Sequence, residues 1–167
     1  MNTLLVHDLM DRNVVTVFMQ TPVPDIARLL TEKRAEGLPV IDNERHLLGI
    51  VTENDLFVKE ERLPRTRLTY QTVFGMPITL GQLQKVYAQR GAIATAGDVM
   101  TSKVVWVRAT SSIGEAIRLM VRYGFSCLPV LEGAREPDGK LAGIITRSGI
   151  LRLLAGVKQS SVRSTRD

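Results

Sequence analysis

Cysteine and histidine are nearly missing from this chain of 167 residues. Cys127 is the only cysteine, so no disulfide can form within the chain. His7 and His46 are the only histidines, and these three side chains lie in different segments, so a zinc site is not expected. The sequence shows no Cys-His pairing, Ser-His-Asp set or nucleophile elbow. It therefore predicts neither an enzyme nor a metal centre.

Long apolar runs are missing as well, and none approaches the ~20 residues that a membrane helix needs. The first residues carry Asp8 and Asp11, which interrupt the pattern of a signal peptide. A single cysteine also suits a reducing compartment. These features predict a cytoplasmic protein without a membrane partner.

Aromatic residues make up only 5% of the chain, which leaves few platforms on which nucleic-acid bases could stack. The net charge is +5 and the pI about 9.7, but the basic residues are interspersed with acids except in the polar tail 157–167. That tail is expected to be disordered. A nucleic-acid partner is therefore not favoured, and a small ligand that bears phosphate would use the same positive charge.

The second half of the chain repeats the sequence pattern of the first half. A shift of ninety residues aligns residues 8–42 with the second half without a gap, and Leu38-Pro39-Val40 falls on Leu128-Pro129-Val130. The second copy has four extra residues within 132–140, after which Gly49-Ile50 matches Gly143-Ile144. A match that keeps register over this length indicates a tandem duplication.

The local pattern of the first copy predicts the order strand, helix, strand, strand, helix. The β-branched run Val14–Val17 predicts a strand. Thr21 is expected to cap a helix whose first residue is Pro22. Leu38–Ile41 and Leu47–Val51 predict two further strands, joined by a polar turn.

The second copy repeats this order. Ser112 and Glu115 have the spacing of a capping box at the start of its first helix. Asp138-Gly139 predicts a hairpin turn. In both copies a second helix is expected after a threonine, Thr52 or Thr146. Cys127 aligns with Gly37, so it is expected to be a small buried side chain.

Both copies carry the same three motifs: Asp-x-Met at the start, x-x-Pro-Val in the middle, and Gly-Ile-h-Thr before the last helix, where h is an apolar residue. With these motifs the chain resembles a tandem pair of cystathionine-beta-synthase (CBS) domains. The resemblance implies an α/β (α+β) fold of two β-α-β-β-α repeats, packed with pseudo-two-fold symmetry. The expected divisions are 1–58 for repeat 1, 59–96 for a structured connector with a helix near Leu83, 97–156 for repeat 2, and the tail 157–167.

The same resemblance implies a function. The clefts between paired repeats in this family commonly bind AMP, ADP, ATP, S-adenosylmethionine or sometimes a dinucleotide, with magnesium expected only beside ATP. Family members are generally regulatory and usually form homodimers. The chain is therefore expected to bind an adenosine-containing ligand and to signal to a regulated partner by a conformational change. The alternative is a ligand-free dimerisation module with a decayed nucleotide site.

The two copies differ by one carboxylate at the start of the last helix. GIVTENDL, residues 49–56, contains Asp55, whereas GIITRSGI, residues 143–150, has Gly149 in its place. From spacing alone, Thr52 and Asp55 would be a helix capping box. The family resemblance implies that Asp55 holds both ribose hydroxyls and that Thr52 faces the phosphate. Because the second copy does without the acid, we favour the ligand role.

The remaining site residues are expected from the resemblance, and each has a structural alternative. The apolar ones could be core, and Lys103 and Arg147 could be solvated. The base would lie among residues of the first two strands, with an equivalent place in the second copy, and the second cleft would keep polar candidates around Arg147. The residues are Val15, Thr16, Leu38, Pro39 and Val40 for the base, Lys103 and Val104 for the equivalent place, and Thr146, Arg147 and Ser148 for the second cleft. The sequence leaves open the identity of the ligand, the number of occupied clefts and the dimer orientation.

Overall fold

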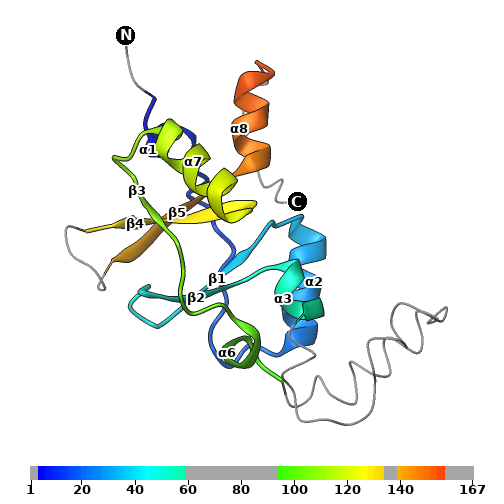
Figure 1. Ribbon diagram of the computed structural model, residues 1–167. Helices are drawn as coiled ribbons and strands as arrows, with labels where there is room; N and C mark the ends of the chain where they lie inside the picture. The colour runs from blue at the N-terminus through cyan, green and yellow to red at the C-terminus, as the bar shows by residue number, and fades with distance from the viewer. Residues whose placement is uncertain (1–3, 59–93, 134–138, 157–167) are drawn as a thin grey trace, which may run out of the picture. The chain divides into compact units, whose positions relative to one another are not determined.

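The computed structural model describes residues 4–58, 94–133 and 139–156 (Figure 1). The predicted connector helix near Leu83, residues 134–138 of the expected hairpin turn and the tail 157–167 lie outside these ranges. None of the helices within them combines the length and the apolar character that crossing a bilayer requires. The elements are α1 (Val6–Leu9), α2 (Val23–Lys33), β1 (Leu38–Ile41), β2 (Leu47–Val51), α3 (Glu53–Val58), α6 (Ala96–Val99), β3 (Val107–Arg108), α7 (Ile113–Tyr123), β4 (Cys127–Glu132), β5 (Lys140–Thr146) and α8 (Arg147–Leu154).

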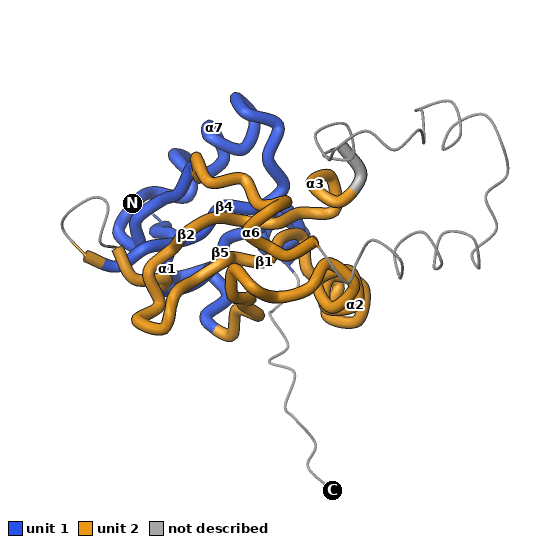
Figure 2. Tube along the Cα trace, turned by 90° about the horizontal axis from the view of Figure 1, so that it is seen from below, with its two compact units in different colours: residues 1–12, 105–132, 142–167 blue, residues 13–104, 133–141 orange. Residues whose placement is uncertain are grey.

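The elements group into two compact units that do not coincide with the two sequence copies (Figure 2). Unit 1 comprises residues 1–12, 105–132 and 142–167, and unit 2 comprises residues 13–104 and 133–141. Helix α1 therefore belongs with the strands and helices of the second copy, and α6 belongs with those of the first. Each copy contributes its first helix to the unit that the other copy builds.

Unit 2 contains the first long helix, α2, which buries an apolar stripe that includes Ile26 and Leu30. The prediction that Thr21 caps this helix was wrong, because Pro22 is the N-cap residue and the helix begins at Val23. Pro22 has the extended conformation that the N-cap position requires, with φ −64° and ψ 144°. The hydroxyl of Thr21 instead accepts a hydrogen bond from the backbone N–H of Phe18, at 3.0 Å.

The sheet of unit 2 is an antiparallel pair, in which Val40 of β1 lies opposite Gly49 of β2. The predicted strand Val14–Val17 was wrong in extent, because only Val17 pairs, as a parallel bridge to Val40. Residues 14–16 make no bridge to another segment. On the other side of the pair, Ile50 and Thr101 exchange two backbone hydrogen bonds of 3.0 and 2.9 Å. Four backbone segments thus lie in the order Val17, β1, β2, Thr101.

Unit 1 repeats this order with its own residues. β3 pairs in parallel with β4, β4 lies beside β5, and Ile144 of β5 exchanges hydrogen bonds of 2.8 and 3.0 Å with Asp11. Helix α7 begins as predicted, because the Ser112 hydroxyl accepts from the N–H of Glu115 at 3.2 Å. Cys127 is buried at the start of β4, as its alignment with Gly37 predicted.

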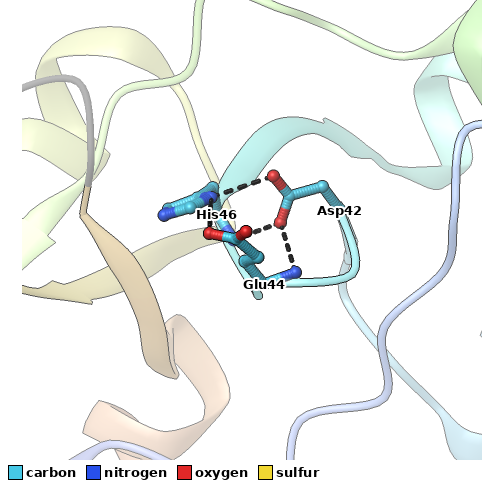
Figure 3. A network of polar contacts seen from close by, with 3 residues as sticks. All are labelled: Asp42, Glu44 and His46. Carbon is cyan, nitrogen blue, oxygen red and sulfur yellow. Dashed lines mark hydrogen bonds and ion pairs between the residues drawn. The ribbon is translucent and has the colours of Figure 1, made fainter.

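A polar turn joins β1 to β2, as predicted, and Asp42 organises it (Figure 3). One oxygen of Asp42 accepts from the backbone N–H groups of Glu44 and His46, both at 2.9 Å. The other oxygen lies 2.9 Å from Nδ1 of His46. The hydrogen bond from the His46 side chain holds the pKa of Asp42 below its ordinary value, because it stabilises the carboxylate.

Candidate functional site

Asp55 lies in the first turn of α3, directly after the end of β2. Its Oδ2 accepts hydrogen bonds from the backbone N–H of Thr52 at 2.9 Å and from the Thr52 hydroxyl at 2.8 Å. These contacts are the capping arrangement that the spacing of the two residues allows. The Asp55 side chain is half-buried, so the carboxylate does not turn into bulk water.

The second oxygen of Asp55 is engaged by a residue that the sequence did not reveal. Oδ1 accepts a hydrogen bond of 2.9 Å from the hydroxyl of Thr101, which lies forty-six positions further along the chain. The backbone pairing of Thr101 with Ile50 holds that hydroxyl in place. The only sequence signal was a difference between the copies, because Thr101 follows Met100 where Asp11 follows Met10.

Thr52, Asp55 and Thr101 therefore form one hydrogen-bonded cluster in unit 2. A carboxylate offers about four acceptor positions on its two oxygens, and Thr52 and Thr101 fill three of them, so the two donors of a ligand diol would have to displace at least one threonine donor. A vicinal diol presents two O–H donors at a spacing that a single carboxylate can bridge. The chemistry of the cluster suits a sugar.

The other residues expected in unit 2 take different positions. Val15 and Thr16 are half-buried next to the Val17 bridge, at the opposite edge of the four-segment order from Thr101. Lys103 is exposed and Val104 half-buried, on the segment that follows Thr101. The side chains of β1 form the core, where they pack among buried neighbours rather than facing solvent. Those core residues are Leu38, Pro39 and Val40.

Thr146, Arg147 and Ser148 belong to unit 1, at the start of α8. The Thr146 hydroxyl accepts from the N–H of Gly149 at 3.0 Å and shares a hydrogen bond of 3.1 Å with Ser148. The guanidinium of Arg147 donates to the carbonyl of Met120, in the last turn of α7, at 3.1 Å. Arg147 thus adds a donor to a helix carbonyl that already accepts from the backbone N–H of Phe125, a role that neither of its expected alternatives included.

Metal binding has no support in the part of the chain that the structure describes, where no three His, Cys, Asp or Glu side chains gather around a possible ion. The predicted site residues instead form two groups, one in each compact unit. Only the group in unit 2 contains the threonine-oriented carboxylate of Asp55.

Comparison with known proteins identifies the family to which this chain is related. The family model described as CBS domain matches residues 6–60 and 96–156. The CBS domain-containing protein CBSX2, chloroplastic, from Arabidopsis thaliana is 33% identical over 158 residues, covering 92% of this chain. This chain spans only 64% of the length of that relative.

Solved structures agree with this relationship. The crystal structure of CBSX2 in complex with AMP is 30% identical, with a TM-score of 0.66, and the match covers 93% of this chain and 99% of the other. The CBS domain pair of protein MJ0100, in complex with 5′-methylthioadenosine and S-adenosyl-L-methionine, shares the fold at 22% identity and a TM-score of 0.65, covering 94% and 100%. The α+β fold with small sheets is therefore that of a CBS pair, and the chain belongs to the CBS-domain family.

Proposed function

We propose that this protein is a regulatory module that binds an adenosine-containing ligand, with Asp55 holding the ribose hydroxyls. The observation that carries the proposal is the half-buried carboxylate of Asp55, which Thr52 and Thr101 orient through both of its oxygens. A carboxylate fixed in this way is an acceptor pair for a vicinal diol. The relative CBSX2, crystallised with AMP, supports an adenine nucleotide. S-adenosylmethionine is the other candidate, and magnesium would enter only with ATP.

The base would use residues at the other edge of the four backbone segments, where Val15 and Thr16 are half-buried. The exposed Lys103, two residues after Thr101, would supply positive charge for a phosphate. The β1 residues, which are core, would shape the site from behind rather than touch the ligand with their side chains. Binding would change the conformation that a regulated partner recognises. We propose that the module has no catalytic activity of its own and acts in the cytoplasm.

The test is a thermal-unfolding panel with AMP, ADP, ATP, S-adenosylmethionine and NAD. A ligand at one hundred times its dissociation constant adds about 2.7 kcal/mol to the free energy of unfolding, which raises the melting temperature by several degrees. Asp55→Ala should remove the shift. Asp98→Ala is the matched control, because Asp98 caps α6 with the same Thr95 contacts of 2.8 and 2.9 Å.

Two results would contradict the proposal. One is the absence of a shift with every ligand in the panel. The other is a shift of the same size in wild-type protein and in Asp55→Ala. A shift that Asp98→Ala keeps and Asp55→Ala loses would locate the effect in the candidate site rather than in helix capping.

A second candidate role is assembly into a homodimer, and the exposed surface of unit 1 favours it. Val121 on α7 is 73% exposed, and Leu151 and Leu154 on α8 are 63% and 76% exposed. The position equivalent to Val121 in the first copy is Thr31, which is polar. Exposed apolar side chains on neighbouring helices are typical of contacts between copies of one chain.

Light scattering after size-exclusion chromatography tests the dimer. Wild-type protein should elute with the mass of two chains, and Val121→Glu should shift it to the mass of one. Thr31→Glu introduces the same charge at the equivalent position of the other copy and should leave the dimer intact. A wild-type monomer, or a dimer that survives Val121→Glu, would count against this role for the α7–α8 surface.

A further inference from the structure

We propose that Thr101 is a positioning residue for Asp55, and that the joint absence of this pair from unit 1 leaves the chain with one diol-binding site. The inference rests on the proposed role of Asp55 as the ribose-binding carboxylate. It adds a residue to that site and fixes the number of ligands that one chain binds.

The contact between the two residues is not part of helix capping. A capping carboxylate uses one oxygen, as Asp98 does when its Oδ2 accepts from both groups of Thr95. Asp55 uses Oδ2 for Thr52 in the same way, and its Oδ1 takes the hydroxyl of Thr101 at 2.9 Å. With a donor on each oxygen, the plane of the carboxylate is fixed. A fixed plane lowers the entropy that a bidentate diol contact costs.

Unit 1 provides an internal comparison, because the same backbone arrangement recurs there. Asp11 pairs with Ile144 through two hydrogen bonds, as Thr101 pairs with Ile50. Two residues after Ile144 the chain reaches Thr146, which begins α8, as Thr52 precedes α3. Asp11 is therefore the residue of unit 1 that matches Thr101 in the backbone pairing, although its side chain is exposed whereas that of Thr101 is half-buried.

The units differ at two matching pairs of positions, Thr101 against Asp11 and Asp55 against Gly149, and the two differences are physically linked. In unit 2 the side-chain oxygens at the two positions lie 2.9 Å apart, which requires a donor opposite the carboxylate. Asp11 offers no donor at the matching position of unit 1, because a carboxylate accepts hydrogen bonds and does not donate them. An aspartate in place of Gly149 would therefore lack the contact that holds the plane of the Asp55 carboxylate in unit 2.

Space is not the obstacle to an acid at this position. A Cβ at Gly149 would lie 3.2 Å from the Thr146 hydroxyl and 3.9 Å from a guanidinium nitrogen of Arg152, which small adjustments can accommodate. Packing around Gly149 therefore does not exclude an acid, and the guanidinium of Arg152 would attract one. Replacing Asp11 by threonine should supply the donor that an aspartate at 149 would otherwise lack.

The first experiment tests positioning, by isothermal titration of AMP and, separately, of S-adenosylmethionine. Thr101→Val keeps the shape of the side chain and removes its donor, and it should weaken binding about 5- to 10-fold, as expected for the loss of one hydrogen bond of ordinary strength. Thr101→Ser should restore binding to within about 3-fold, because it restores that hydrogen bond. Thr95→Val removes the same kind of contact from Asp98 and should leave affinity unchanged.

The outcomes separate the two proposals. If wild-type protein binds neither probe, the proposed function fails. If wild type binds and Thr101→Val binds equally well, the positioning role is overturned while the function stands. A loss in Thr101→Val that Thr101→Ser does not restore would also overturn it, because the hydroxyl would not be the active group.

The second experiment counts sites from the same titrations. Wild-type protein and Gly149→Asp should each bind one ligand per chain, and the double variant Asp11→Thr/Gly149→Asp should bind two. Two ligands on wild-type protein, or on Gly149→Asp alone, would overturn the proposal. A double variant that binds one ligand, with circular dichroism showing native helix content, would show that this pair of positions does not decide occupancy.

Discussion

Gly143 should not tolerate even one added carbon atom. An ideal Cβ at this position would lie 2.7 Å from the backbone oxygen of Asp11 and 2.9 Å from Sδ of Met10. Contacts between non-bonded heavy atoms are favourable near 3.5–4.0 Å, so β5 and the Asp11 segment would have to separate by several tenths of an ångström. That movement stretches the two hydrogen bonds that join Asp11 to Ile144.

The cost of Gly143→Ala can be estimated from these contacts. Overpacking of a core by a methyl group typically costs about 1–3 kcal/mol, and the lower entropy of alanine in the unfolded chain returns about 0.4–1 kcal/mol. Because the closest atom belongs to the backbone and cannot rotate away, we expect a net loss of about 1–2 kcal/mol. Gly49→Ala meets Sδ of Met100 at 2.5 Å, but a methionine side chain is flexible, so it should cost less.

Urea unfolding followed by circular dichroism measures the difference, with the midpoint as the readout. Gly114→Ala in α7 is the control, because a Cβ there would meet only the Ser112 hydroxyl at an ordinary 3.8 Å, and alanine favours a helix by up to about 1 kcal/mol. The expected order of stability is Gly114→Ala, wild type, Gly49→Ala, Gly143→Ala. If Gly143→Ala were as stable as wild type, the close approach of these two backbone segments would be refuted.

Three further predictions address the core, a helix cap and the polar turn. Leu38→Ala and Leu128→Ala, each at a fully buried position, should lower the free energy of unfolding by about 2–5 kcal/mol in urea titrations, and a cost below 1 kcal/mol would contradict their place in the two cores. Ser112→Ala should cost about 1 kcal/mol in the same assay, because it removes the acceptor for the N–H of Glu115, whereas Ser112→Asn should be close to neutral. The lowered pKa of Asp42 stabilises the protein above about pH 4, and this stabilisation is lost as the pH falls through the folded-state pKa. Asp42→Asn should therefore show a smaller drop in melting temperature between pH 5 and pH 2 than wild type, and parallel curves would argue against the contact with His46.

Short-range patterns predicted most of the local structure. The apolar stripe of α2, the Ser112 cap and the strands Leu38–Ile41 and Leu47–Val51 depend on neighbours within a few positions, and all were found. The β-branched run Val14–Val17 shows the limit of such reasoning. Its preference for extended backbone is real, but pairing is set by the partner strand, and only Val17 lies opposite β1.

Long-range arrangement was not available from the sequence. The four-residue helices α1 and α6 carry no signal that says which copy they pack against, and each belongs to the unit of the other copy. Thr101 was missed for the same reason, since its partner Asp55 is forty-six positions away. The duplication did point to the difference, because Asp11 and Thr101 occupy matching positions with different chemistry.

The duplication also shows why capping does not account for Asp55. Helix α8 begins without an acid, because the Thr146 hydroxyl accepts directly from the N–H of Gly149, so a threonine is enough to start a helix at this place in the fold. Where an acid does cap, as at Asp98, one oxygen serves the threonine. Asp55 does this with Oδ2 and then presents Oδ1 to the hydroxyl of a separate segment, which adds nothing to the start of α3. The contact therefore ties α3 to the segment that follows α6, in addition to the cap. The proposed ligand role would be a further use of the carboxylate that this contact orients.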